Sequence, residues 1–159
     1  MRKVYRISLF DTITNGFIAG AIGITAMTLG EKVEQGITGR PSSYVPGHTS
    51  EKLLGLKTKP DSERFMMNHV MHFGQGILAG SIRSMMSAYG MDGPFSSFMF
   101  VFIRLMIDQS LENLTGVGAP PWTWPYNEQV IDILHKMVYA FVTGAVSDYL
   151  VTKKYIKTE

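Results

Sequence analysis

The chain has 159 residues, 45% of them hydrophobic, which is sufficient for one domain with its own core. It contains no cysteine, so disulfide frameworks and thiol chemistry are excluded. The formal net charge is only +2 and the basic residues are scattered, which argues against nucleic-acid binding.

The first hydrophobic segment, residues 12–30, contains no Asp, Glu, Lys or Arg, and its length is about that which spans a bilayer core. We expect a helix at 8–34 that ends before Gly36 and the breaker Gly39-Arg40-Pro41. A basic start followed by an apolar run is also typical of a signal peptide. We interpret this segment as the first helix of the fold.

A polar loop, residues 36–64, follows the first helix and contains three prolines. Within it we expect a short helix at 50–56, with Ser50 as its cap and its leucines docked on the other helices. The second long helix is predicted at 62–89, capped by Asp61 or Ser62. Its uncharged stretch is interrupted by two histidines.

The last two predicted helices cover 94–114 and 127–154. Pro94 suits a first helical turn, and Asn127 is a natural cap. The loop between them, 116–127, combines helix-stopping Gly and Pro with the segment PPWTWPY. Each of these helices has an uncharged core of only 11 positions, at 93–103 and 137–147, so their membrane signal is weaker.

Three features favour a membrane location over water. Glycine is frequent inside the apolar segments, where a soluble helix would lose about 1 kcal/mol per Gly relative to Ala. The aromatic loop is typical of an interfacial belt, and both termini are basic. The sequence therefore predicts an all-α, antiparallel four-helix transmembrane bundle with two long loops on one side, integral to the inner or plasma membrane. A soluble four-helix protein is the alternative.

Orientation in the membrane follows from the loops. The loop at 116–127 contains no Lys or Arg, which suits the outside, whereas the first long loop carries several basic residues, which argues against that side. We expect both termini to be cytoplasmic.

The titratable side chains concentrate where the predicted helices meet the two long loops. Because successive helices run antiparallel, the end of one helix lies beside the start of the next. At 100° per residue, each helix also carries one polar or small stripe, which lipid should force inward. The residues of this predicted site are Glu31, His69, His72, Arg104, Asp108, Glu112, Asp132, His135 and Tyr139.

Three interpretations of this site remain open. In the first, the polar groups pair with one another and merely fix the packing of the helices. In the second, which we favour, they form a pocket for a small lipophilic or anionic molecule. Arg104 would anchor an anionic or carbonyl group, Asp108 and Glu112 would set the charge, and His72 and His135 would act as acid and base. Tyr139, Glu31 and His69 would add contacts to the ligand, with Trp122 and Trp124 as a roof.

The third interpretation is a metal site. Helix bundles with inward Glu and His side chains hold di-metal centres, and the candidate ligands are Glu31, His72, Asp108, Glu112 and His135. The Glu-x-x-His spacing of those proteins is absent. A copper variant would use the soft thioethers of Met66, Met67 and Met71 with the histidines. No cofactor can be named from these residues alone.

A rival to all pocket interpretations is an assembly or conduction role. The G-x-x-x-G faces at Gly16/Gly20 and Gly76/Gly80 could pack against a second copy, with the polar layer as a proton or ion path. The sequence contains no P-loop, zinc-protease, serine-hydrolase or EF-hand signature, which argues against nucleotide-driven chemistry and serine hydrolysis.

Several short motifs resemble the YagU-like group of small four-helix inner-membrane proteins. They are Gly16-Phe-Ile-Ala-Gly20, Thr25-Ala-Met27-Thr28, Gly39-Arg40-Pro41-Ser42-Ser43-Tyr44, His72 with Gly74 and Gly76, Asp108, and His135-Lys136. The resemblance touches all four predicted helices, but its motifs are mostly small and apolar. It implies a membrane location and four spans, and it supplies no reaction or ligand set.

Overall fold

The computed structural model describes the backbone of residues 7–158 and the side chains of residues 7–153. Helices account for all regular structure in this part, which contains no strand and confirms the all-α prediction. The basic residues that mark the two termini lie outside this part: Arg2, Lys3 and Arg6 at one end, and the side chains of Lys154 and Lys157 at the other. The elements are α1 (Leu9–Thr38), α2 (Val45–Leu53), η1 (Asp61–Glu63), α3 (Phe65–Ala88), α4 (Gly93–Leu114), η2 (Pro121–Thr123) and α5 (Tyr126–Thr158).

The long helices match the predicted ones, but several ends differ. α1 continues past Gly36 and ends at Gly39, whose φ of 72° gives the left-handed cap that glycine adopts without strain. The short helix begins at Val45 with a proline in its first turn, so the prediction of Ser50 as its cap is wrong. Ser50 instead lies inside α2 and donates to the Pro46 carbonyl. Pro94 occupies the first turn of α4, as predicted.

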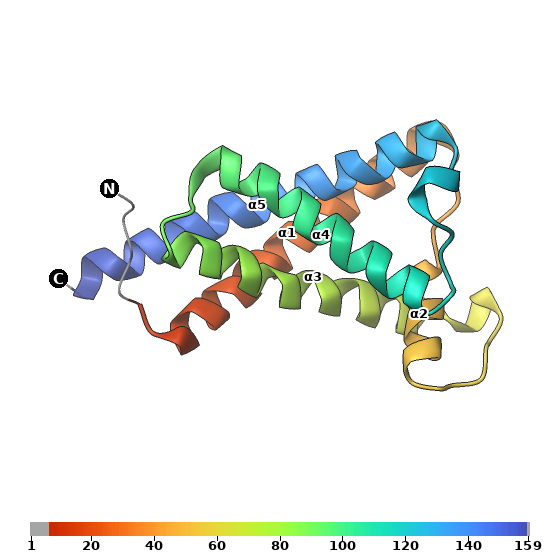
Figure 1. The fold of residues 1–159 in the computed structure, drawn as a ribbon. Helices are drawn as coiled ribbons and strands as arrows, with labels where there is room; N and C mark the ends of the chain where they lie inside the picture. Colours follow the sequence, from red (N-terminus) through yellow and green to blue (C-terminus); the bar gives the residue numbers. More distant parts are fainter. Residues whose placement is uncertain (1–6, 159) are drawn as a thin grey trace.

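The four long helices lie side by side and alternate in direction along the chain (Figure 1). α1 packs mainly on α3 and α5, and α4 packs mainly on α5. The tight turn between α3 and α4 lies at the same end as the start of α1 and the end of α5 (Figure 1). We call this the termini end. α2 and both long loops lie at the opposite end, the loop end (Figure 1).

Glycines allow α1 and α3 to approach each other at backbone distance. A Cβ added to Gly16 would meet the backbone of Ser81, and one added to Gly80 would meet the backbone of Gly16 and Gly20. A Cβ on Gly20 would lie 2.5 Å from the Gly76 carbonyl oxygen. No side chain fits at these positions without moving a helix.

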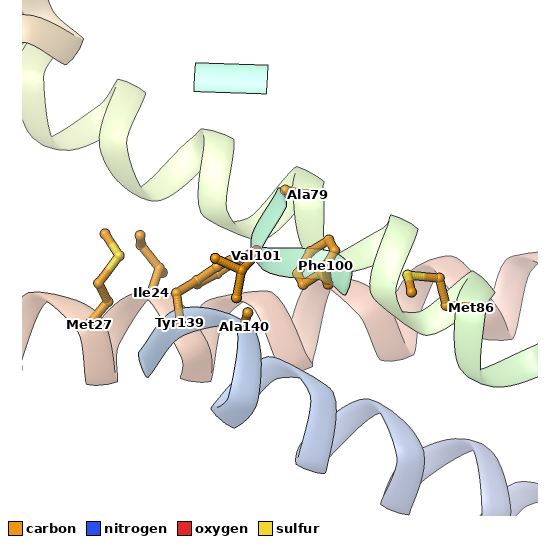
Figure 2. Packing of buried hydrophobic residues seen from close by; sticks show 8 residues of the cluster. All are labelled: Ile24, Met27, Ala79, Met86, Phe100, Val101, Tyr139 and Ala140. Carbon is orange, nitrogen blue, oxygen red and sulfur yellow. The ribbon is translucent and has the colours of Figure 1, made fainter. Parts of the chain in front are cut away.

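The apolar core is small. It draws two side chains from each long helix (Figure 2), namely Ile24, Met27, Ala79, Met86, Phe100, Val101, Tyr139 and Ala140. Among the described residues, sixteen buried side chains are polar or charged, whereas ten are hydrophobic. Thirty large hydrophobic side chains of the same part are exposed. The described part thus buries more polar than apolar side chains and exposes many large apolar ones.

Two of the described helices are long and apolar enough to cross a membrane, judged by length and composition. They are α1 and the segment Tyr126–Lys153 of α5. Both belong to the set predicted to span the bilayer.

Candidate functional site

A cavity of about 620 Å³ opens at the loop end, between the ends of all four long helices. The loop before α2 and the segment 117–124 cover it. Eight of the ten residues predicted to bind or act on a ligand line it: Glu31, His69, His72, Arg104, Asp108, Glu112, Trp124 and His135. The antiparallel order of the helices brings the seven helical residues together, because most of them lie toward the loop ends of their helices, and Trp124 joins them from the loop before α5.

Two predicted residues lie elsewhere. Tyr139 is completely buried one turn beyond the cavity, and its hydroxyl donates to the Gly76 carbonyl at 2.6 Å. Trp122 is 79% exposed and does not line the cavity. Trp122 lies within the 3-10 turn η2 and Trp124 directly follows it. Only Trp124 lines the cavity, and its indole N–H donates to the Ala119 carbonyl at 2.8 Å.

A chain of four alternating charges forms the floor of the cavity. Arg104 Nη1 lies 2.7 Å from Asp108 Oδ1, and Lys136 Nζ lies 3.3 Å from Asp108 Oδ2. Lys136 also donates to Asp132 at 2.5 Å. Arg104, Asp108 and Lys136 are buried, so each charge needs the next one as its counterion.

Arg104 is the least satisfied member of this chain. Its guanidinium is 3% exposed and lies 5.5 Å from the centroid of the Tyr139 ring. The contact with Asp108 has ion-pair distance but not hydrogen-bond geometry. Arg104 Nε and Nη1 and Asp108 Oδ1 therefore have no hydrogen-bond partner among the described residues. Buried guanidinium N–H groups without an acceptor are costly, which is the physical signal of a site for an acceptor.

The walls of the cavity carry proton-exchanging groups. His72 Nε2 lies 3.0 Å from Thr28 Oγ1, whose hydroxyl donates to the Ile24 carbonyl, so this ring nitrogen is the donor to Thr28. His135 and the carboxylate of Glu112 make no hydrogen bond or ion pair within the described part of the chain. Glu31 is held by the Gln35 amide at 2.8 Å.

The loop before α2 is fixed over the cavity by local hydrogen bonds. Asn68 on α3 accepts from the Gly47 backbone N–H at 2.9 Å and donates to the Ser43 carbonyl at 3.1 Å. Lys32 at the end of α1 donates to Ser42 at 2.9 Å. The cover is thus attached to both α1 and α3.

A buried ion pair anchors α2 itself. Arg64 Nε and Nη2 each donate to Glu51 at 3.1 Å, and Arg64 also contacts Asp61 and the Lys59 carbonyl. The Arg64 hydrogen bonds hold the pKa of Glu51 below its ordinary value, although burial opposes them.

Acid should release this anchor. A carboxylate with a lowered folded-state pKa stabilises the fold above its unfolded pKa, about 4.3 for Glu, and the contribution is lost as pH falls through the lowered value. We expect hydrogen exchange in 45–63 to accelerate below about pH 4 more than in α3. In Glu51→Gln the exchange of this segment should already be fast at pH 7 and change little with acid. Equal acid sensitivity in both proteins would contradict the assignment to Glu51.

The metal alternative finds no geometric support. Among the residues that the structure describes, no group of three or more His, Asp or Glu side chains converges in a way that could hold one ion. The five predicted ligands line the same cavity from four different helices, and the carboxylate of Asp108 is engaged by Arg104 and Lys136.

Sequence reasoning missed a second polar cluster, at the termini end. Arg83 on α3 is completely buried and donates through both Nη atoms to Asp148 on α5 at 2.9 Å. The sequence signal was available: each is an isolated charge inside an apolar stretch, and the two are of opposite sign. Helical periodicity places Arg83 on the same face as His72 and Gly80, but it does not identify Asp148 as the partner.

Comparison of the chain with protein-family models, with curated proteins and with solved structures finds no match.

Proposed function

We propose that the protein is an integral membrane protein whose four long helices all cross the bilayer, with both termini in the cytoplasm. The apolar exterior supports this, because every long helix exposes large hydrophobic side chains over its middle. Examples are Phe17, Ile18 and Ile22 on α1, Leu78 and Ile82 on α3, Phe98 and Phe102 on α4, and Leu134, Val138 and Phe141 on α5. The close glycine contacts between α1 and α3 support G-x-x-x-G packing, and the whole is consistent with a YagU-like four-span protein.

Within this bundle, we propose that the loop-end cavity binds a small organic molecule through an anionic or carbonyl group. One observation carries the proposal: the buried guanidinium of Arg104 lines the cavity, and its Nε and Nη1 groups make no hydrogen bond within the described residues beyond the ion-pair contact of Nη1 with Asp108. A carboxylate or carbonyl of the ligand would satisfy them. Apolar walls from Met27, Phe65 and Trp124 suit the rest of such a molecule.

The opposite wall adds a second requirement. Glu112 has no cationic partner within hydrogen-bond distance, so the ligand should also present a donor group or be protonated there. His72 and His135 flank the same space and are the groups that would exchange a proton with the ligand.

Arg104→Gln tests the proposal by titration of the detergent-purified protein with benzoate, decanoate and benzenesulfonate. We expect the wild type to bind at least one of these anions and the variant to bind it about 10- to 100-fold more weakly, since a hydrogen bond to a charged group contributes about 1.5–3 kcal/mol. Lys52→Gln, which removes a positive charge from α2 outside the cavity, should bind like the wild type.

Two results would overturn the proposal. One is the absence of binding of all three anions to a folded wild-type protein. The other is unchanged affinity in Arg104→Gln, because the anchor would then lie elsewhere. Circular dichroism of each variant separates loss of binding from loss of fold.

A further inference from the structure

The cluster at the termini end closes that end of the helix assembly. Asp148 accepts from both Arg83 Nη atoms at 2.9 Å, from the Ser87 hydroxyl at 2.6 Å and from the Gly93 backbone N–H at 2.9 Å. Ser97 on α4 accepts from Arg83 at 3.2 Å. One carboxylate thus joins α3, the start of α4, and α5.

A line of buried polar side chains runs between this cluster and the cavity. On α5, Tyr139, Thr143 and Ser147 follow one another at one-turn spacing, and all three are completely buried. Ser84 on α3 is also completely buried. The hydroxyls of Ser147 and Ser84 have no hydrogen-bond partner among the described residues, and the hydroxyl of Thr143 lies beside that of Tyr139. We call these four residues the polar seam.

The contacts of the seam connect its two ends. At the cavity end, the Tyr139 ring lies beside Arg104. At the other end, a Cβ on Gly144 would meet the Ser97 hydroxyl and would lie 3.0 Å from Arg83 Nε and Nη2. From Lys136 on the cavity floor to Asp148, α5 rises about 18 Å, roughly half the thickness of a bilayer.

Packing alone does not account for the seam. Each buried hydroxyl without a partner costs about 1–3 kcal/mol, so alanine or valine would stabilise a purely structural core. The seam instead lines the interior with hydroxyl donors and places an arginine at each end, Arg104 and Arg83. That chemistry matches an anionic group, the same group proposed to bind in the cavity.

The seam is also too tight to be an open pore. A Cβ on Gly23 would meet the Thr143 hydroxyl, and the Gly144 contacts leave no space for a methyl group. Passage of any solute therefore requires α5 to move relative to α1 and α4. Because glycine has no side chain to interlock with the opposite helix, these interfaces are compatible with sliding of one helix along another.

We propose that the protein transports a small organic anion across the membrane by alternating access. The cavity beneath its covering loops at the loop end is the binding site, the Arg83–Asp148 pair is the closed gate at the termini end, and the polar seam is the path between them. This proposal rests on the proposed binding function, since the transported molecule is the one held by Arg104.

The absence of cysteine makes a direct test possible in the otherwise unmodified protein. Single substitutions Thr143→Cys in the seam, Ser43→Cys over the cavity and Tyr89→Cys at the termini end are reconstituted in vesicles of known orientation. A membrane-impermeant maleimide is then added from one side or the other. Ser43→Cys and Tyr89→Cys report which end faces the reagent, because both residues are exposed.

Transport predicts that Thr143→Cys is labelled slowly from both sides. Adding Asp148→Asn, which weakens the gate while keeping its shape, should raise labelling from the termini side at least about tenfold. Labelling from the loop side alone in both backgrounds would overturn the proposal, because the cavity would be a dead end. A seam cysteine that stays unreactive from both sides would overturn it as well.

The wild-type and Thr143→Cys proteins are first titrated with the three anions used above. If none binds to the wild type, the proposed binding function fails. If binding is retained but the seam is not reached from the termini side, only transport fails. Circular dichroism of the Asp148→Asn protein distinguishes an opened gate from an unfolded helix assembly.

Discussion

Gly80→Leu should prevent α1 and α3 from packing, and we expect it to lower the free energy of unfolding by at least about 3 kcal/mol. The Cβ alone would collide with the backbone of Gly16 and Gly20. Backbone, unlike the end of a flexible side chain, can yield only if the whole helix shifts. Denaturant titration in detergent, followed by circular dichroism, measures the loss.

Gly74→Ala is the matched control on the same helix. A Cβ at Gly74 meets nothing within 4 Å, so alanine should leave the packing unchanged and add about 0.5–1 kcal/mol through its helix propensity. Similar destabilisation by both substitutions would show that glycine at these positions serves helix flexibility and not the close approach of two backbones.

The sequence predicted the long helices because each contains a long uncharged, apolar stretch. Such a stretch is not stable as a solvent-exposed loop. The sequence predicted the helix ends less well, since a glycine can either stop a helix or lie within one. Gly36 lies within α1, and Gly39, three residues later, stops it. Only the local backbone geometry separates the two cases.

Eight of the ten predicted site residues line one cavity. Their positions along the helices could be predicted from the sequence, and the antiparallel order of the helices then implied that they would lie close together. The rotation of each helix about its own axis was less readable. Tyr139 faces the core beyond the cavity floor, and Trp122 points to the outside while Trp124, two residues on, points in. Those differences depend on helix packing and on the conformation of a short turn.

The partner of Arg83 could not be assigned for the same reason. Sequence periodicity shows that an arginine faces inward, but the neighbour it meets depends on the relative rotation and height of two helices. The seam was equally hidden, because Ser and Thr in a membrane helix are compatible with either an inward or a lipid-facing position.

Arg83→Met should cost about 3–5 kcal/mol, because it leaves Asp148 partly buried without its counterion. Arg40→Met removes an arginine that is 27% exposed, whereas Arg83 is completely buried, and we expect a loss of at most about 1 kcal/mol. Urea titration of the two variants in the same detergent compares them directly. Equal losses in the free energy of unfolding would mean that the Arg83–Asp148 pair is already hydrated and does not act as a gate.

A double variant, Arg83→Met with Asp148→Leu, tests what the pair is for. Replacing both charges with apolar groups of similar size should recover most of the stability, since neither charge then remains unpaired. Opening a gate differs from truncating one partner of the pair. When the wild-type pair separates toward water, both charges regain hydration, so opening costs much less than truncation. The double variant should therefore be stable yet locked, with Thr143→Cys protected from the termini side.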